Sequence, residues 1–135
     1  MCYFYYTMRK KAHILFTALI LLILSAPLYA AGHRLIDQPE LEAMMQDGKP
    51  IVIVDLREPA LFRQGHIPGA INIPYDEAYK RTPKELKKDQ RIVFVCHSGP
   101  MGDRVAGYLY KLGYRDLYNL KWGMKGWKGK LERGE

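Results

Sequence analysis

Apolar and polar positions alternate in blocks along the chain from about residue 33 onward. The two strongest apolar blocks are residues 51–54 and 92–95, and both are rich in β-branched side chains. Unbroken runs of this kind are typical of parallel strands that are covered on both faces. Weaker runs at 33–36, 70–72 and 116–120 predict three shorter strands, the first of them at an edge of the sheet.

Helix signals lie between these apolar runs. Asp37 is a good N-cap residue, and Glu40 three positions later completes a capping box. Gly113 is the expected stop of a helix whose apolar positions recur at helical spacing. We expect helices at residues 37–47, at 59–64, from Thr82 with Pro83 at its first position, at 103–112 and at 123–127. Because strands and helices alternate throughout, the predicted class is α/β with a parallel sheet.

The first 30 residues have the pattern of a leader. Three basic residues at 9–11 precede an apolar stretch at 12–24, and small residues follow up to Ala31. This arrangement is typical of a secretory signal peptide. We expect cleavage after Ala30, with Ala31 as the alternative position.

An uncleaved membrane anchor is the other interpretation of this leader. Residues 12–31 carry no formally charged side chain, and about 20 apolar residues can span a bilayer. In both cases the basic residues stay in the cytoplasm, so the domain at 31–135 is expected outside the inner membrane, in the periplasm. Translation that begins at Met8 would give the leader a more usual start.

Composition and charge narrow the function classes. With 135 residues, of which 48% are hydrophobic and 26% are charged, the chain suits one globular domain at 31–135. Residues 1–30 hold three of the 21 basic residues and none of the 14 acidic ones, so the domain carries a net charge of +4. Its densest basic run, residues 80–88, lacks the aromatic spacing of a single-strand binding face. We therefore interpret that run as a solvated helix face and expect no nucleic-acid partner.

The domain contains a single cysteine, Cys96, and therefore cannot form an internal disulfide. A lone thiol in an oxidising compartment is a liability unless the protein uses it, although a buried inert cysteine is the alternative. Cys96 directly follows a buried strand, at the sheet edge where open parallel sheets bind ligands.

A short loop and a helix start follow Cys96. The candidate binding loop consists of His97, Ser98, Gly99, Pro100, Met101 and Gly102. Inward-turned backbone N–H groups and the helix dipole stabilise negative charge, so we expect them to favour the thiolate. Since the thiolate is the nucleophilic form of cysteine, the pattern predicts a sulfur nucleophile at residue 96.

Three segments resemble the rhodanese family in the right order. Residues 51–74, IVIVDLREPALFRQGHIPGAINIP, resemble the family signature D-x-R-E followed by G-H-I-P-G-A-x-N-I-P. Residues 93–114, VFVCHSGPMGDRVAGYLYKLGY, resemble its catalytic cysteine loop with the flanking strand and helix. Residues 118–127, YNLKWGMKGW, resemble its closing segment. The implied fold is α/β and rhodanese-like, a central parallel sheet with helices on both faces.

The resemblance also implies a sulfurtransferase. The Cys96 thiolate would take the outer sulfur of thiosulfate or of a persulfide donor and pass it to cyanide or to a thiol, which can belong to a protein. The loop amides would hold the persulfide anion, and the Ser98 hydroxyl would point to the same anion. No metal and no other cofactor is needed, and the membrane is a partner only through an uncleaved leader.

The loop departs from the family pattern C-R-x-G-x-R. His97 and Met101 stand at the two arginine positions, Pro100 removes an amide donor and Asp103 adds a negative charge. Losing two charge-assisted contacts, each worth roughly 1.5–3 kcal/mol, predicts weak binding of a dianion such as thiosulfate. Two functions from different classes stay open: an active sulfurtransferase, and a weakly catalytic sulfur carrier or partner-binding module.

Several charged residues near these motifs receive structural interpretations. Asp55 and Arg57 lie, by resemblance, at the rim of the site, and we expect an ion pair that ties the strand end to adjacent loops. His66 is expected to satisfy backbone groups within its own turn, and Arg104 to pair locally with Asp103. His97 either supplies positive charge to a bound anion or faces solvent.

Other cysteine and metal chemistries fit the sequence poorly. A cysteine phosphatase requires an arginine at the position of Gly102, and a thioredoxin-like redox site requires a cysteine at Gly99. The histidines at 33, 66 and 97 are scattered along the chain, so they make no ligand cluster of usual spacing.

Overall fold

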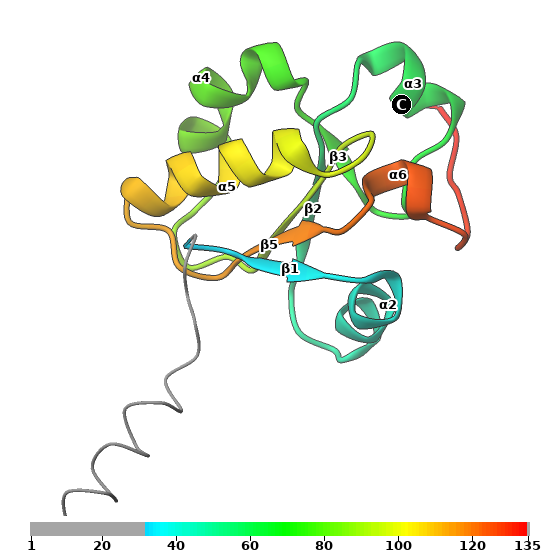
Figure 1. The fold of residues 1–135 in the computed structure, drawn as a ribbon, viewed down its shortest axis with the longest axis horizontal. Helices are drawn as coiled ribbons and strands as arrows, with labels where there is room; N and C mark the ends of the chain where they lie inside the picture. Colours follow the sequence, from blue (N-terminus) through cyan, green and yellow to red (C-terminus); the bar gives the residue numbers. More distant parts are fainter. Residues whose placement is uncertain (1–31, 135) are drawn as a thin grey trace, which may run out of the picture.

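The computed structural model describes residues 32–134. These residues form a five-stranded sheet in which all neighbouring strands are parallel, with the order β1-β5-β4-β2-β3 (Figure 1). The strands are β1 (Arg34–Ile36), β2 (Val52–Asp55), β3 (Ile71–Asn72), β4 (Ile92–Val95) and β5 (Leu117–Leu120). The helices are α2 (Gln38–Gln46), α3 (Pro59–Gln64), α4 (Tyr75–Glu85), α5 (Pro100–Lys111) and α6 (Gly123–Gly126).

Side chains of the central strand β4 enter two hydrophobic clusters, one on each face of the sheet. Ile92 and Phe94 pack with residues of α4 and α5, and Cys96 continues the same row. Val93 and Val95 pack with the buried face of α2 and with Trp127. Figure 1 shows α4 and α5 on one side of the sheet and α2 on the other. The predicted α/β fold with a parallel sheet covered on both faces is confirmed.

Local helix signals explain several boundaries. The Asp37 side chain accepts from the backbone N–H of Glu40 at 3.0 Å, while the Glu40 side chain accepts from the backbone N–H of Asp37 at 3.0 Å. This is the capping box that the sequence predicts at the start of α2. At the end of α5, Gly113 takes a φ of 98°, a left-handed conformation that favours glycine.

The prediction that a helix begins at Thr82 is wrong. Helix α4 begins at Tyr75, seven residues earlier, and Pro83 lies inside its last turn. A proline in that position leaves the carbonyl of Tyr79 without its usual helical N–H donor. The Tyr108 hydroxyl of α5 donates to that carbonyl at 3.3 Å, so a tertiary contact compensates for the proline.

Helix α5 also differs from the prediction, because it begins at Pro100 and not at residue 103. Proline suits the first helical position, where its fixed φ matches the helix and a missing N–H costs nothing. The earlier start carries the helix N-terminus up to the cysteine loop, so Met101, Gly102 and Asp103 belong to its first turn.

The predicted leader at 1–30 lies outside the described residues, and so does its alternative, the anchor. Within residues 32–134, no helix combines the length and the apolar character that crossing a bilayer requires.

Candidate active site around Cys96

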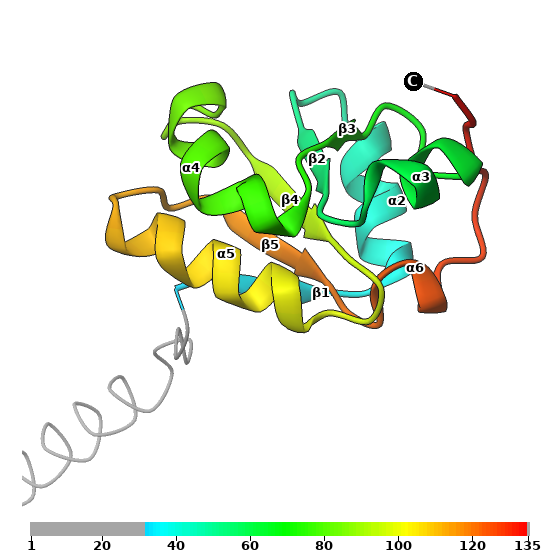
Figure 2. The same ribbon diagram turned by 90° about the horizontal axis from the view of Figure 1, so that it is seen from above.

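Cys96 directly follows β4, at the carboxyl edge of the sheet. Figure 2 shows that β4 and β5 point toward the end of the domain that carries α3 and α6. The thiol is buried, with 1% of the residue exposed, and the backbone N–H of Gly99 donates to Sγ at 3.0 Å. This N–H is a backbone donor that the loop aims at the sulfur atom. The strand, the turn and the helix start thus meet at Cys96 as the sequence predicts.

The conformation of Gly99 aims this N–H at the sulfur. Gly99 has a φ of 121° and a ψ of −44°, which side chains of the L series rarely adopt. A Cβ atom built on Gly99 would meet no heavy atom within 4 Å. Glycine is therefore required at this position by backbone conformation and not by crowding.

The side chain of Asn119, in β5, holds the cysteine loop in place through two hydrogen bonds. Its side-chain Nδ2 donates to the Gly99 carbonyl oxygen at 2.9 Å and to Asp103 Oδ1 at 2.7 Å. His33 Nε2 lies 2.8 Å from the same Asp103 oxygen. The carboxylate of Asp103, which was expected to oppose a bound anion, is thus engaged in a network that joins residues before β1 and in β5 to the cysteine loop.

Gly102 allows this network to form, because a Cβ on Gly102 would collide with the Asn119 side-chain oxygen. Asn119 is fully buried, and within the described residues its Oδ1 has no hydrogen-bond partner. No sequence-based prediction included Asn119. The signal that could have found it is a single amide side chain inside a short strand whose other residues are leucine and tyrosine.

The short helix α6 also supports the cysteine loop. The backbone N–H groups of Met124 and Lys125 donate to the carbonyl oxygens of Cys96 and His97 at 2.8 Å and 2.9 Å. A Cβ on Gly123 would collide with the Cys96 carbonyl oxygen, so this approach requires glycine. Trp122, which precedes this helix, takes a φ of 67° and is 65% exposed.

Asp55 and Arg57 form the expected ion pair behind the site. Arg57 Nη2 lies 2.6 Å from Asp55 Oδ2 and 2.8 Å from the Gly65 carbonyl oxygen, and both charged residues are buried. The side-chain amide of Asn72 donates to the carbonyl oxygens of Asp55 and Arg57, at 2.9 Å each. The pair therefore ties the end of β2 to the turn after α3 and to β3.

Two further predicted residues act structurally. His66 is buried, stacks on Phe62 with ring centroids 3.7 Å apart, and places Nδ1 2.9 Å from the Phe62 carbonyl oxygen. Arg104 does not pair with its neighbour Asp103, because that carboxylate engages Asn119 and His33. The guanidinium instead lies near Tyr75. A hydrogen bond with Tyr79, and then the hydrogen bond with Arg104, lower the pKa of Tyr75.

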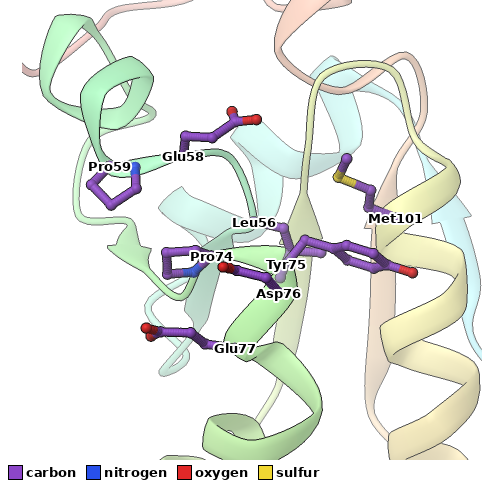
Figure 3. Close-up of a pocket in the computed structure, with 8 residues that line it drawn as sticks. All are labelled: Leu56, Glu58, Pro59, Pro74, Tyr75, Asp76, Glu77 and Met101. Atoms are coloured by element: carbon purple, nitrogen blue, oxygen red, sulfur yellow. The ribbon is translucent and has the colours of Figure 1, made fainter.

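The remaining loop side chains are exposed or line a neighbouring pocket. Ser98 and His97 are exposed, and His97 Nε2 lies 3.3 Å from Glu58 Oε2. Half-buried Met101 lines a pocket of about 430 Å³ at the carboxyl ends of β2 and β3 (Figure 3). The lining residues are Leu56, Glu58, Pro59, Pro74, Tyr75, Asp76, Glu77 and Met101. They contribute three carboxylates and no cationic group.

The carboxylates of this pocket follow directly from two local features. Glu58 precedes α3, and Asp76 and Glu77 occupy the first turn of α4, where negative charge suits the helix dipole. This pocket was not predicted from the sequence, because a helix start at Thr82 leaves Asp76 and Glu77 outside any helix.

Titratable groups at this site form no cluster suited to a metal. No group of three His, Cys, Asp or Glu side chains within residues 32–134 could hold a metal ion.

Known proteins are similar to this chain over most of its length. The model of the Rhodanese-like domain matches residues 37–130. The uncharacterized protein YqhL of Bacillus subtilis (strain 168) is 32% identical over 119 residues, which cover 88% of this chain and 92% of YqhL. A sulfurtransferase of Allochromatium vinosum is 34% identical over 92 residues, which cover 68% of this chain and 85% of that protein.

Another relative is longer than this chain. YrkF of Bacillus subtilis (strain 168), named as a candidate sulfur carrier, is 35% identical over 100 residues, which cover 72% of this chain but only 54% of YrkF. The chain therefore spans about half the length of that relative.

Solved structures share the fold. The crystal structure of a rhodanese-like domain protein from Staphylococcus aureus matches with a TM-score of 0.68 and 29% identity, covering 76% of this chain and 99% of that one. Together with the family match over residues 37–130, this likeness leads to one assignment. The chain belongs to the family of rhodanese-like domains.

Proposed function

We propose that this protein is a sulfurtransferase that carries sulfane sulfur as a persulfide on Cys96. The observation that carries the proposal is the 3.0 Å hydrogen bond from the Gly99 N–H to Cys96 Sγ, at the carboxyl edge of a rhodanese-like sheet. Relatives that share this domain are named as a sulfurtransferase and as thiosulfate sulfurtransferases, which supports the same reaction class.

The reaction has two displacement steps. The Cys96 thiolate attacks the outer sulfur of a donor, a bond forms between Sγ and that sulfur, and the sulfur–sulfur bond of the donor breaks. The electron pair leaves with the donor as a thiolate, or as sulfite when the donor is thiosulfate. An acceptor thiolate or cyanide then attacks the outer sulfur of the persulfide, and the Cys96 thiolate is regenerated.

The chain itself contributes orientation and anion stabilisation. The Gly99 N–H donates to the sulfur, and the Asn119 side chain donates to the Gly99 carbonyl. Two backbone N–H groups of α6 donate to the Cys96 and His97 carbonyls. Because these groups are fixed before the donor arrives, little reorganisation is needed when charge moves between sulfur atoms.

The charges near the loop favour a thiol-bound persulfide over thiosulfate as donor. His97 lies beside Glu58, Met101 is uncharged, and the neighbouring pocket presents carboxylates. A dianion that approaches Cys96 from this side meets repulsion where the family pattern supplies two arginines.

Intact mass spectrometry tests the proposal directly. The full chain is incubated with thiosulfate or with an organic persulfide, and the expected result is a gain of one sulfur atom that cyanide or excess thiol removes. Cys96→Ala must not gain this sulfur, whereas Cys2→Ser must gain it. A chain that gains no sulfur from either donor contradicts the proposal.

A sulfur carrier with little turnover is the second candidate. The uncharged residue at 101 and the likeness to a candidate sulfur carrier favour it. A carrier loads one sulfur per chain and releases it slowly to small thiols, whereas a sulfurtransferase turns over many times. Counting product molecules per Cys96 during prolonged incubation distinguishes the two.

The leader at 1–30 leads us to propose export of the domain to the periplasm. Cell fractionation and the N-terminal sequence of the accumulated protein test this proposal. Export with a new N-terminus at residue 31 or 32 supports a signal peptide, and export with the leader intact supports an anchor. Retention in the cytoplasm contradicts both.

A further inference from the structure

We propose that the pocket beside the cysteine loop selects sulfur compounds whose organic part is cationic, such as aminoalkyl thiols and their persulfides, and discriminates against anionic ones. This inference rests on the proposed sulfur transfer, and it names the substrate class for that same site.

The pocket and the cysteine loop share a boundary. Met101, in the first turn of α5, forms one wall of the pocket, and Figure 3 shows it across the pocket from Pro59 and Pro74. The Leu56 N–H donates to the carbonyl oxygen of Val95, the residue before Cys96, at 2.8 Å. Leu56 and Cys96 belong to one hydrophobic cluster, against which Met101 packs. A molecule in this pocket therefore lies against both ends of the loop that holds the sulfur.

Apolar and acidic groups divide the pocket between them. Leu56, Met101 and the proline rings offer an apolar surface for a short alkyl chain, and the Met101 thioether is a soft, polarisable contact for sulfur compounds. Glu58, Asp76 and Glu77 offer carboxylates to a cationic end group (Figure 3). The volume of about 430 Å³ falls within the usual range for small-molecule sites.

The carboxylates differ in how far other charges neutralise them. Glu77 pairs with Arg81 at 2.8 Å, and Glu58 has the His97 imidazole at 3.3 Å. Hydrogen bonds with its own backbone N–H and then with His97 hold the pKa of Glu58 below its ordinary value, so it is ionised at neutral pH. Arg104 engages the Tyr75 hydroxyl at another part of the pocket lining. Asp76 forms no ion pair within residues 32–134 and carries the clearest uncompensated charge.

This local charge opposes the charge of the whole domain. Residues 31–135 carry a net charge of +4, which attracts anions at long range. The net charge of the domain therefore cannot cause a preference for cations at Cys96. If such a preference is measured, the carboxylates of the pocket are its source. The preference should also weaken at high salt, because the carboxylates are solvent-exposed.

Methanethiosulfonate reagents test the pocket without sulfurtransferase turnover. The Cys96 thiolate attacks their sulfenyl sulfur, a disulfide forms and methanesulfinate leaves. The ethylammonium and ethylsulfonate reagents differ little in size and have opposite charge. The full chain is used in a Cys2→Ser background, so that Cys96 is the only thiol. The rate with the ethylammonium reagent is divided by the rate with the ethylsulfonate reagent. This ratio is then divided by the same ratio for 2-mercaptoethanol, which corrects for the intrinsic reactivity of the two reagents.

We expect this normalised ratio to favour the cation by about three- to tenfold, since one charge a few ångströms away changes the rate about threefold in water. Asp76→Asn and Glu58→Gln should each lower the ratio about twofold to threefold. Asp89→Asn is the matched control, because it removes one exposed carboxylate near the amino end of β4, at the opposite edge of the sheet. Asp89→Asn should leave the ratio unchanged.

Sulfur transfer from the loaded chain provides the second readout. Cysteamine should accept sulfur from Cys96 persulfide about three- to tenfold faster than 3-mercaptopropionate, after correction for the thiolate fraction of each, and Asp76→Asn should reduce this advantage. A normalised ratio of one or less, or an equal fall in Asp89→Asn and Asp76→Asn, overturns the pocket assignment. A chain that shows the reagent preference but never gains sulfur contradicts the proposed function alone, so the two failures are distinguishable.

Discussion

The side-chain amide of Asn119 donates to the carbonyl oxygen of Gly99 at 2.9 Å, and the N–H of the same glycine donates to Cys96 Sγ at 3.0 Å. Asn119 therefore holds the carbonyl group of Gly99, and the N–H of Gly99 contacts the sulfur of Cys96. Since Asn119 is fully buried on β5, this contact transmits the rigidity of the sheet to the loop.

Asn119→Ala should slow persulfide formation about tenfold and lower the free energy of unfolding by about 1–2 kcal/mol, because a buried hydrogen-bond donor is lost. Asn72→Ala is the matched control, since Asn72 makes the same kind of amide-to-carbonyl bonds to Asp55 and Arg57 away from the sulfur. Stopped-flow alkylation of Cys96 and urea denaturation measure the two effects. Equal loss of Cys96 reactivity in both variants would show that Asn119 acts only through stability.

The sequence predicts structure best where the interacting residues are close together along the chain. The placement of Cys96 between a strand and a helix start was predicted because an apolar strand, a glycine-containing turn and a helix start follow one another along the chain. The capping box of Asp37 and Glu40 was predicted for the same reason, since both of its hydrogen bonds lie within four residues.

Contacts between distant residues were not predicted. The Asn119–Gly99 bond joins residues 20 apart, and the His33–Asp103 contact joins residues 70 apart, so no periodicity or cap signal contains them. The wrong start of α4 has the same origin, because the contact that makes Pro83 tolerable comes from Tyr108 on another helix. The family resemblance supplied the fold and the signature residue Glu58, but Asp76 and Glu77 were not assigned to a pocket because the start of α4 was placed at Thr82.

Gly99→Ala should be destabilising although there is room for the methyl group. The φ of 121° costs an alanine about 1–3 kcal/mol, and relief of this strain would turn the N–H away from Sγ. Gly107→Ala is the control, because Gly107 lies inside α5, also has nothing within 4 Å of a Cβ, and has a helical backbone. That variant should be unchanged or more stable by up to about 1 kcal/mol.

Urea denaturation and the Cys96 alkylation rate report on both glycine variants. We expect Gly99→Ala to lose stability and thiol reactivity together, and Gly107→Ala to lose neither. Full Cys96 reactivity in Gly99→Ala would mean that the N–H of residue 99 does not activate the sulfur.

Acid should weaken the domain partly through Asp47. Hydrogen bonds with the Arg91 guanidinium, and then with the Lys49 N–H, hold the pKa of Asp47 well below its ordinary value of 3.8. A carboxyl whose pKa is lower in the folded state stabilises the fold above its unfolded pKa, and this stabilisation is lost as the pH falls below about 4. Asp47→Asn should therefore flatten the acid side of the stability–pH curve. Circular dichroism during urea denaturation between pH 2 and pH 7 measures this slope (both values bracket an unfolded carboxyl pKa of about 4).

The matched variant for this measurement is Asp89→Asn, since Asp89 is exposed and has no resolved partner among the ion pairs of residues 32–134. Its slope should equal that of the natural chain. An unchanged slope in Asp47→Asn would mean that the Asp47–Arg91 contact, at 2.6 Å in the structure, does not persist in solution.

Met101→Arg should make thiosulfate a better sulfur donor for Cys96. The guanidinium would enter the wall that Met101 now forms, partly neutralise Glu58 and Asp76, and offer a charge-assisted contact worth roughly 1.5–3 kcal/mol to the donor. The KM for thiosulfate should fall about tenfold or more, while the preference for cationic methanethiosulfonates should disappear.

Leu35→Arg adds the same charge to exposed β1 at the edge of the sheet and controls for net charge. If both variants lower the KM equally, long-range attraction explains the gain; if neither does, the missing arginine is not what limits thiosulfate use. A fall confined to Met101→Arg would show that one thioether at the pocket wall keeps dianions from Cys96.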